Sequence, residues 1–121
     1  MACLRLTLLE PKDGHREELQ TVLMRLDEKL ANTPGLIFSF VTEIEADKLG
    51  RVALWRSKED ANHAAMRDDV LAVRAKLRSL ALGTEETLME LRSGFLPEPL
   101  AALIAGERVM EPVAFNLGAV A

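Results

Sequence analysis

The apolar residues of this chain follow two periods, which alternate along its first 95 residues. Leucines alternate with polar residues over positions 4–8, which predicts a strand with one strongly apolar face. Steps of three and four residues over positions 19–30 predict an amphipathic helix. Residues 32–35 (NTPG) end that helix, since proline cannot continue its hydrogen-bond ladder. Residues 36–44, rich in β-branched and aromatic side chains, predict a second strand, which a short loop joins to a partner strand at 51–56.

A second and longer amphipathic helix is predicted over residues 57–82. Ser57 opens it with the pattern of a capping box, and Gly83 is suited to end it. Residues 87–95 then predict a last strand. The apolar stripe of this helix consists of Met66, Val70, Val73, Leu77 and Leu80.

The order of these elements, β-α-β-β-α-β, predicts a ferredoxin-like α+β domain over residues 1–96. In that fold a four-stranded antiparallel sheet carries both helices on one face. The predicted strands at 36–44 and 87–95 nevertheless have apolar residues on both sides. Because an open apolar sheet face is typical of an interface, we expect a homodimer that packs sheet to sheet.

The remaining residues, 97–121, form a C-terminal extension. Residues 99–106 predict two turns of helix, with proline early and glycine at the end, and residues 107–113 have an extended pattern. The extension contains enough leucine, isoleucine, valine and phenylalanine to pack. We expect it to pack on its own subunit or on the partner.

Composition narrows the classes of ligand and partner. The 121 residues carry a net charge of −4, which argues against a nucleic-acid surface with its clustered lysines and arginines. No apolar run approaches the ~20 residues of a membrane span, so no membrane partner is expected. The single cysteine, Cys3, excludes an intramolecular disulfide and fits a reducing cytoplasm. Two distant histidines offer no metal-ligand spacing, and no phosphate-binding glycine loop is present, so neither metal nor cofactor is expected.

Two stretches resemble a known family. They are Thr33-Pro34-Gly35-Leu36, and the run VALWRSKEDANHAAMRDDVLAVRAKL at residues 52–77. A tryptophan that ends a strand, a short polar step and a helix with an early histidine are similar to the antibiotic biosynthesis monooxygenase-type domains of the dimeric α/β-barrel superfamily. The resemblance covers residues 3–96. It implies a sheet-to-sheet dimer with a pocket between sheet and helices, and one of several activities: oxygenation of phenols without metal or flavin, quinol oxidation, or haem degradation.

His63 is the candidate catalytic residue. It lies near the edge of the apolar stripe, and an imidazole can accept a proton near neutral pH. Glu59, one turn earlier, could pair with it and favour its charged form. The alternative is a histidine that packs at the edge between helix and sheet.

Four further residues are candidates for substrate binding. Trp55 could form an aromatic wall for a planar substrate, or it could be a core residue at a strand end. Thr7 could direct a hydroxyl into the pocket, or it could be an ordinary β-branched strand residue. Phe40 and Met66 complete the set.

The resemblance, together with these candidate residues, implies a cofactor-independent monooxygenase that acts on a small aromatic phenol or quinol. The alternative is a non-catalytic ligand-binding or interaction protein on the same dimeric scaffold. Haem binding or degradation is a third reading. Haem-degrading members of the family use an asparagine on the first strand, and Thr7 occupies the matching region here.

Overall fold

One sheet and four helices make up the described part of the chain. The structure is a computed structural model that describes residues 1–45, 47–106 and 112–115. The elements are β1 (Cys3–Pro11), α1 (Arg16–Leu30), β2 (Leu36–Ile44), β3 (Lys48–Trp55), α2 (Lys58–Ala65), α3 (Asp68–Leu80), β4 (Ala81–Glu90) and α4 (Glu98–Ile104).

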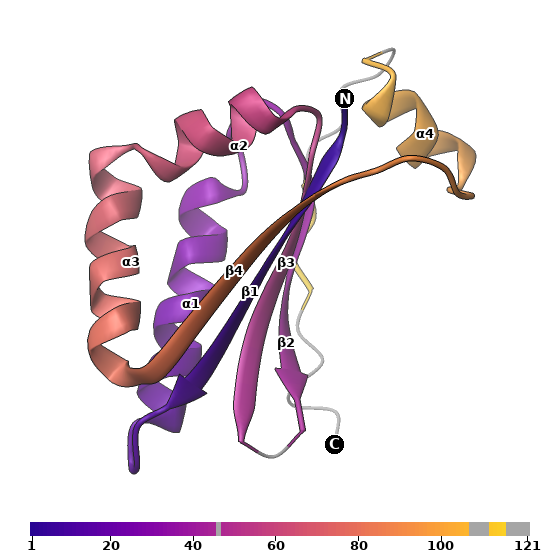
Figure 1. Cartoon of the computed structure of the whole chain (residues 1–121). Coiled ribbons are helices and arrows are strands. Elements are labelled where there is room, and N and C mark those ends of the chain that lie inside the picture. The colour runs from indigo at the N-terminus through magenta and orange to yellow at the C-terminus, as the bar shows by residue number, and fades with distance from the viewer. Residues whose placement is uncertain (46, 107–111, 116–121) are drawn as a thin grey trace.

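The four strands form a single antiparallel sheet in the order β2-β3-β1-β4. Helices α1, α2 and α3 cover one face of it, and α4 lies on the other side (Figure 1). The predicted ferredoxin-like α+β fold is therefore confirmed, with α4 as an addition after the last strand.

The two faces of β1 differ in a way that its leucines alone do not reveal. Cys3, Thr7 and Leu9 are buried beneath the helices, whereas the leucines at 4, 6 and 8 are only partly buried and point to the opposite face. The strongly apolar face of this strand is thus the one that the helix layer does not cover. The helix-covered core continues from Cys3 and Leu9 through Leu49 and Trp55, which lie opposite them on β3.

The long helix predicted over residues 57–82 is two helices, and this prediction was wrong. Ser57 does cap the first, because its hydroxyl accepts a hydrogen bond from the backbone N–H of Asp60 (3.1 Å), but α2 ends at Ala65. Arg67 is extended (φ −63°, ψ 139°), and α3 starts at Asp68, where acidic residues favour a new N-terminus. Met66 lies at the break and is 70% exposed, so it does not belong to the stripe, whose other members are buried.

The last strand begins and ends earlier than its predicted range of 87–95. β4 follows α3 directly, and Gly83 is a strand residue instead of a helix terminator. β4 is an edge strand whose one neighbour is β1, and their pairing ends where Cys3 meets Glu90. The length of β1 therefore sets the end of β4, and Phe95 lies beyond it, fully exposed.

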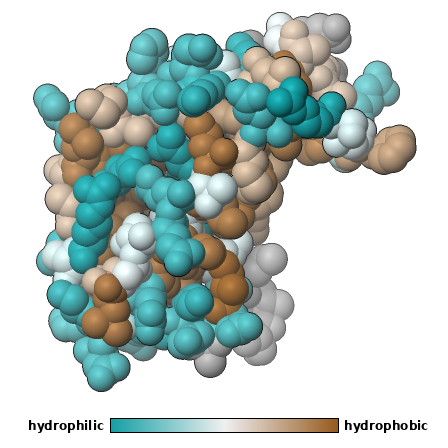
Figure 2. Space-filling view, viewed as in Figure 1, coloured by the Kyte–Doolittle hydropathy of each residue, from teal (hydrophilic) through white to brown (hydrophobic). Residues whose placement is uncertain are grey.

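The C-terminal extension contains the predicted helix as α4. It contacts β2, and the Phe115 ring packs edge-on against Phe40 with ring centroids 5.7 Å apart. Hydrophobic residues are visible over α4 and between the hydrophilic residues of the helix layer (Figure 2). The extended segment predicted at 107–113 lies largely outside the described residues.

Candidate functional site

The five predicted site residues lie in different parts of the molecule. Thr7 and Trp55 are buried between the sheet and the helices. His63 is exposed on α2, Met66 is exposed at the break after α2, and Phe40 lies on the sheet face that α4 contacts. Thr7 and Trp55 thus face the helix layer from different positions along the strands, and none of the other three joins either of them there.

His63 lines a surface cleft of about 230 Å³ between α2 and the loop before β2. Gly35 lets this loop approach α2 closely, since its φ is +88° and a Cβ there would lie 2.5 Å from the Cγ of Asp60. No hydrogen bond or ion pair joins His63 to Glu59 within the described chain. The lining residues are Thr33, Pro34, Asp60, His63, Ala64 and Arg67.

Arg67 fixes the far wall of this cleft. Its Nη1 donates to the Thr33 hydroxyl (2.8 Å), and its Nε and Nη2 donate to the two oxygens of Asp69 (3.1 and 2.7 Å). The hydrogen bond to Asp69 raises the pKa of Arg67. Because these contacts already occupy the guanidinium, the imidazole of His63 and the carboxylate of Asp60 are the groups in this cleft that remain available for chemistry.

A second space lies between the sheet and helices α1 and α3. It is small, about 20 Å³, which is room for about one water molecule. Leucines from β1, α1 and α3 form its apolar wall, and its polar wall comes from four different elements. The polar residues in its wall include Thr7 on β1, Arg51 on β3, Arg74 on α3 and Glu86 on β4.

Arg51 is the central charge of this cavity. It is 3% exposed, and its Nε donates to Oδ1 of Asp27 on α1 across 2.6 Å. Burial lowers the pKa of Arg51, while the Asp27 carboxylate acts in the opposite direction. Its Nη2 is buried and has no hydrogen-bond partner among the described residues. A buried charged donor without an acceptor is costly, which marks this atom as a place for a ligand atom or a bound water.

The Arg74–Glu86 pair closes the outer side of the cavity. Nη2 of Arg74 lies 2.6 and 2.7 Å from the two carboxylate oxygens of Glu86, and both side chains are partly exposed. Arg5 lies close by on β1; burial is the main cause of its lowered pKa, and Arg74 adds to it. Cationic side chains outnumber acidic ones around this space: Arg5, Arg51, Arg74 and Arg78 against Asp27 and Glu86.

Sequence reasoning identified Thr7 but missed Arg51, Arg74 and Glu86, although one signal for Arg51 was present. In β3, Leu49, Ala53 and Trp55 alternate on the helix-covered face, and Arg51 occupies the remaining position of that series. An arginine in a core-facing strand position is unusual, because charged side chains are rarely fully buried without a partner. The partner, Asp27, lies 24 residues earlier and could not be paired with it by sequence spacing.

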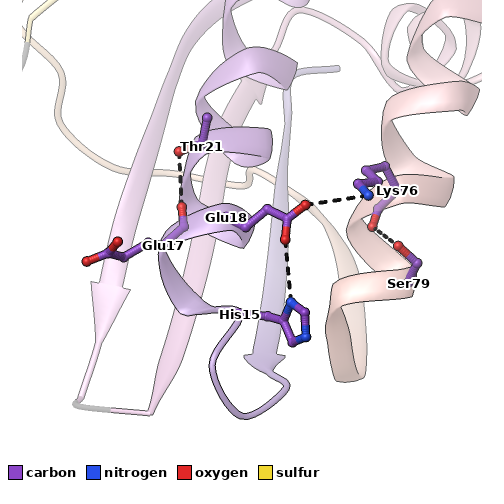
Figure 3. Close-up of polar contacts among 6 residues, drawn as sticks. All are labelled: His15, Glu17, Glu18, Thr21, Lys76 and Ser79. Carbon is purple, nitrogen blue, oxygen red and sulfur yellow. Dashed lines mark hydrogen bonds and ion pairs between the residues drawn. The ribbon is translucent and has the colours of Figure 1, made fainter.

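The second histidine has a structural role at the surface. His15 contacts the Glu18 carboxylate (3.4 Å), whose other oxygen lies 3.5 Å from Nζ of Lys76 on α3 (Figure 3). The hydrogen bond from His15 is the main cause of the lowered pKa of Glu18. These contacts connect α1 with α3 and lie outside both the cleft and the cavity.

Two other observations concern metal binding and membrane spans. Within residues 1–45, 47–106 and 112–115, no three His, Cys, Asp or Glu side chains lie together as a metal site would need. In the same ranges, no helix combines the length and the apolar character of a membrane span. Cys3 is fully buried, and burial raises the pKa of its thiol.

Comparison with known proteins gives a result for structure only. No protein-family model matches the sequence, and no curated protein is significantly similar to it. Among solved structures, SnoaB, a cofactor-independent oxygenase from Streptomyces nogalater, superposes with a TM-score of 0.70 at 20% identity, over 80% of this chain and 98% of that chain. The chain has the fold of this oxygenase.

Two further solved structures have the same fold. Rv0793 from Mycobacterium tuberculosis has a TM-score of 0.73 at 14% identity, over 78% of this chain and 98% of its own. A candidate antibiotic biosynthesis monooxygenase from Caulobacter crescentus has a TM-score of 0.69 at 18% identity, over 76% of this chain and 91% of its own. The resemblance to antibiotic biosynthesis monooxygenase-type domains is thus confirmed at the level of fold. About a fifth of this chain lies outside the fold that it shares with them.

Proposed function

We propose that this protein is a cofactor-independent monooxygenase that acts on a small aromatic phenol or quinol in the space between the sheet and the helices. The likeness in fold to an oxygenase described as cofactor-independent supports the reaction class. The observation that carries the proposal is the buried guanidinium of Arg51 in the wall of the cavity there.

A fixed positive charge suits this chemistry. Ionisation of a phenol makes its ring electron-rich enough to give electrons to oxygen, and a nearby cation favours the ionised form. Arg51 is held by Asp27, so it is already in place before a substrate arrives. The guanidinium is almost completely buried, and low exposure to solvent strengthens its attraction to a phenolate.

Proton removal requires a base, and two residues are candidates. Glu86 has its carboxylate in the wall of the cavity, so it is within reach of a hydroxyl bound there. His63 lines the cleft instead, and it would act on a substrate bound at the surface. The position of Arg51 favours Glu86 for the reaction proposed in the cavity.

Substrate entry requires the cavity to open. A space of about 20 Å³ cannot hold an aromatic ring. The Arg74–Glu86 pair is partly exposed and joins α3 to the edge strand β4, so its separation would open the cavity to solvent. Such an opening would also free the Glu86 carboxylate to accept a proton.

Oxygen uptake tests this proposal. Purified protein is screened with substituted hydroquinones and naphthols, alongside the double variant Arg51→Met/Asp27→Asn, which removes both charges of the buried pair. We expect uptake by the native protein and a loss of about 10²–10³-fold in the double variant. The control is Arg16→Met/Glu43→Gln, an arginine–carboxylate pair outside the cavity (3.4 Å). No uptake with any substrate, or equal uptake by the double variant, contradicts the proposal.

A homodimer through the open sheet face is part of the same proposal. The strand registers align apolar residues of all four strands on this face, and the leucines of β1 form its centre. Light scattering should give twice the subunit mass, and Leu6→Glu should give a monomer because it puts a charge into the apolar interface. Leu71→Glu is the control, because Leu71 is an exposed residue of α3, outside the sheet face. A monomeric native protein at micromolar concentration contradicts the dimer.

The small volume of the cavity favours one alternative, a ligand-binding protein without turnover. A pocket that holds little more than a water molecule suits a small ligand group better than a reacting ring system. Saturable binding without oxygen uptake would support this alternative over the oxygenase.

A further inference from the structure

We propose that the cavity beneath α1 and α3 is a head-group pocket for the carboxylate of a small organic acid, with Nη2 of Arg51 as its principal donor. The inference rests on the proposed function and changes it in one respect: the substrate would be a hydroxy-aromatic acid instead of a neutral quinol, with its carboxylate, and not its phenolate oxygen, against Arg51. As a statement about binding, it does not depend on turnover.

The hydrogen bonds of Arg51 are the first argument. A buried arginine with a purely structural role has its donors matched, and here Asp27 accepts only from Nε. Nη2 is left without an acceptor within the described part of the chain. The other buried side-chain atoms in that condition do not belong to residues that line this cavity; they are Nη1 of Arg16, Oγ1 of Thr42, Nε1 of Trp55 and Nε of Arg56.

The charge around the cavity is the second argument. Three arginines line the space and Arg5 lies close by, whereas only two carboxylates balance them, so a ligand with one negative charge reduces the excess. The two carboxylates are already paired, Asp27 with Arg51 and Glu86 with Arg74. An anion is therefore the ligand class that the unmatched charge selects, and a cation would meet repulsion.

The size and lining of the cavity are the third argument. Its volume of about 20 Å³ accepts a carboxylate oxygen but not a ring, so the charged end of a molecule enters first. Thr7 contributes a hydroxyl to the same wall, which can donate to a second oxygen. The rest of the ligand would lie towards Arg74 and Glu86, the exposed side. Arginine suits this role, because it keeps its charge when buried and its Nη2 can donate to the ligand while Nε stays bound to Asp27.

The test compares matched probes on the full chain. Calorimetry or NMR titration with 4-hydroxybenzoate, 4-methylphenol, acetate and chloride separates the contribution of the carboxylate from that of the ring. We expect 4-hydroxybenzoate to bind at least about tenfold more tightly than 4-methylphenol, with acetate as a competitor. The Nε–Hε NMR signal of Arg51 should shift with both carboxylates and stay unchanged with 4-methylphenol.

Variants then locate the effect. Arg51→Met/Asp27→Asn should lose the preference for 4-hydroxybenzoate over 4-methylphenol, and Arg16→Met/Glu43→Gln should retain it. The double substitution leaves no unpaired charge in the core, and a thermal unfolding curve checks that the variant folds. If it does not fold, Thr7→Val, which removes one donor at nearly constant volume, should weaken 4-hydroxybenzoate binding by about fivefold to tenfold.

Three results would overturn the inference. One is equal affinity for 4-hydroxybenzoate and 4-methylphenol. Another is an unchanged preference in the Arg51→Met/Asp27→Asn protein. The third is chloride that competes as well as acetate, which would make the pocket a general anion site. Carboxylate binding without oxygen uptake leaves the inference standing and removes the oxygenase. Turnover of neutral quinols without any preference for carboxylates would support the oxygenase and overturn the inference.

Discussion

Nε of Arg51 on β3 donates to Oδ1 of Asp27 on α1 across 2.6 Å, in the layer between the sheet and the helices. This ion pair connects a central strand to the first helix at a depth where the arginine is almost inaccessible. Arg51 therefore depends on Asp27, since without this partner its charge would be buried and unpaired, whereas the Asp27 side chain is partly exposed.

The first prediction follows from that dependence. Asp27→Leu alone should destabilise the fold by about 3 kcal/mol, because it leaves the buried guanidinium of Arg51 without its partner. Arg51→Met/Asp27→Leu should be closer to native stability, within about 1–2 kcal/mol, since hydrophobic residues can replace a buried pair. Urea unfolding of both variants measures the difference. Equal destabilisation by the single and the double substitution would show that the two residues are not coupled.

Gly35 provides the second prediction. Its φ of +88° is unfavourable for other residues, and a Cβ there would collide with the side chain of Asp60. Gly35→Ala should therefore cost about 1–3 kcal/mol and widen the cleft that contains His63. Gly83→Ala is the control, because it has no neighbour within 4 Å of the added Cβ and its φ is not positive. Equal unfolding free energies for the two variants would contradict this account.

His63 provides the third prediction, in which activity and stability separate. The side chain is exposed, so His63→Ala should change the unfolding free energy by no more than about 0.5 kcal/mol. If His63 is the general base, turnover of an active phenol or quinol should fall by about 10²–10⁴-fold. Glu86→Gln is the matched comparison, because the base proposed in the cavity is Glu86.

The result assigns the base. A large loss of rate in His63→Ala together with a small one in Glu86→Gln would move the reaction to the surface cleft. The opposite pattern would keep the reaction in the cavity. A large loss of stability in His63→Ala, with unchanged turnover by the protein that remains folded, would make the histidine structural.

The fourth prediction concerns pH. The hydrogen bond from His15 and the contact with Lys76 lower the pKa of Glu18 below its ordinary value of 4.5. A lowered carboxyl pKa in the folded state contributes stability above the unfolded pKa, and that contribution is lost as the pH falls through the folded value. Between about pH 6 and about pH 3, native stability should therefore fall more than that of Glu18→Gln. The group is fully exposed, so high salt should reduce the difference. Parallel pH profiles for the two proteins would refute the assignment.

The sequence determined the order and type of the elements. The alternating leucines of β1 and the three-to-four spacing of α1 are local periods, and they are visible without any partner. The Ser57 cap and the helix at α4 follow from local residue chemistry in the same way. This information was enough for the ferredoxin-like fold, because few arrangements satisfy β-α-β-β-α-β with two amphipathic helices.

Tertiary structure decided what depends on residues far apart in the chain. The end of β4 is set by the length of its neighbour β1, and the break at Met66 and Arg67 is accompanied by contacts of Arg67 with Thr33 and Asp69. The cavity depends even more on distant residues, since its polar wall comes from β1, β3, α3 and β4. The alternation of β3 indicates that Arg51 faces the core, but only the fold places Asp27 beside its Nε and leaves its Nη2 without an acceptor in the described chain. Pairing between residues far apart in the chain is a property of the assembled layers, and no local period along the sequence encodes it.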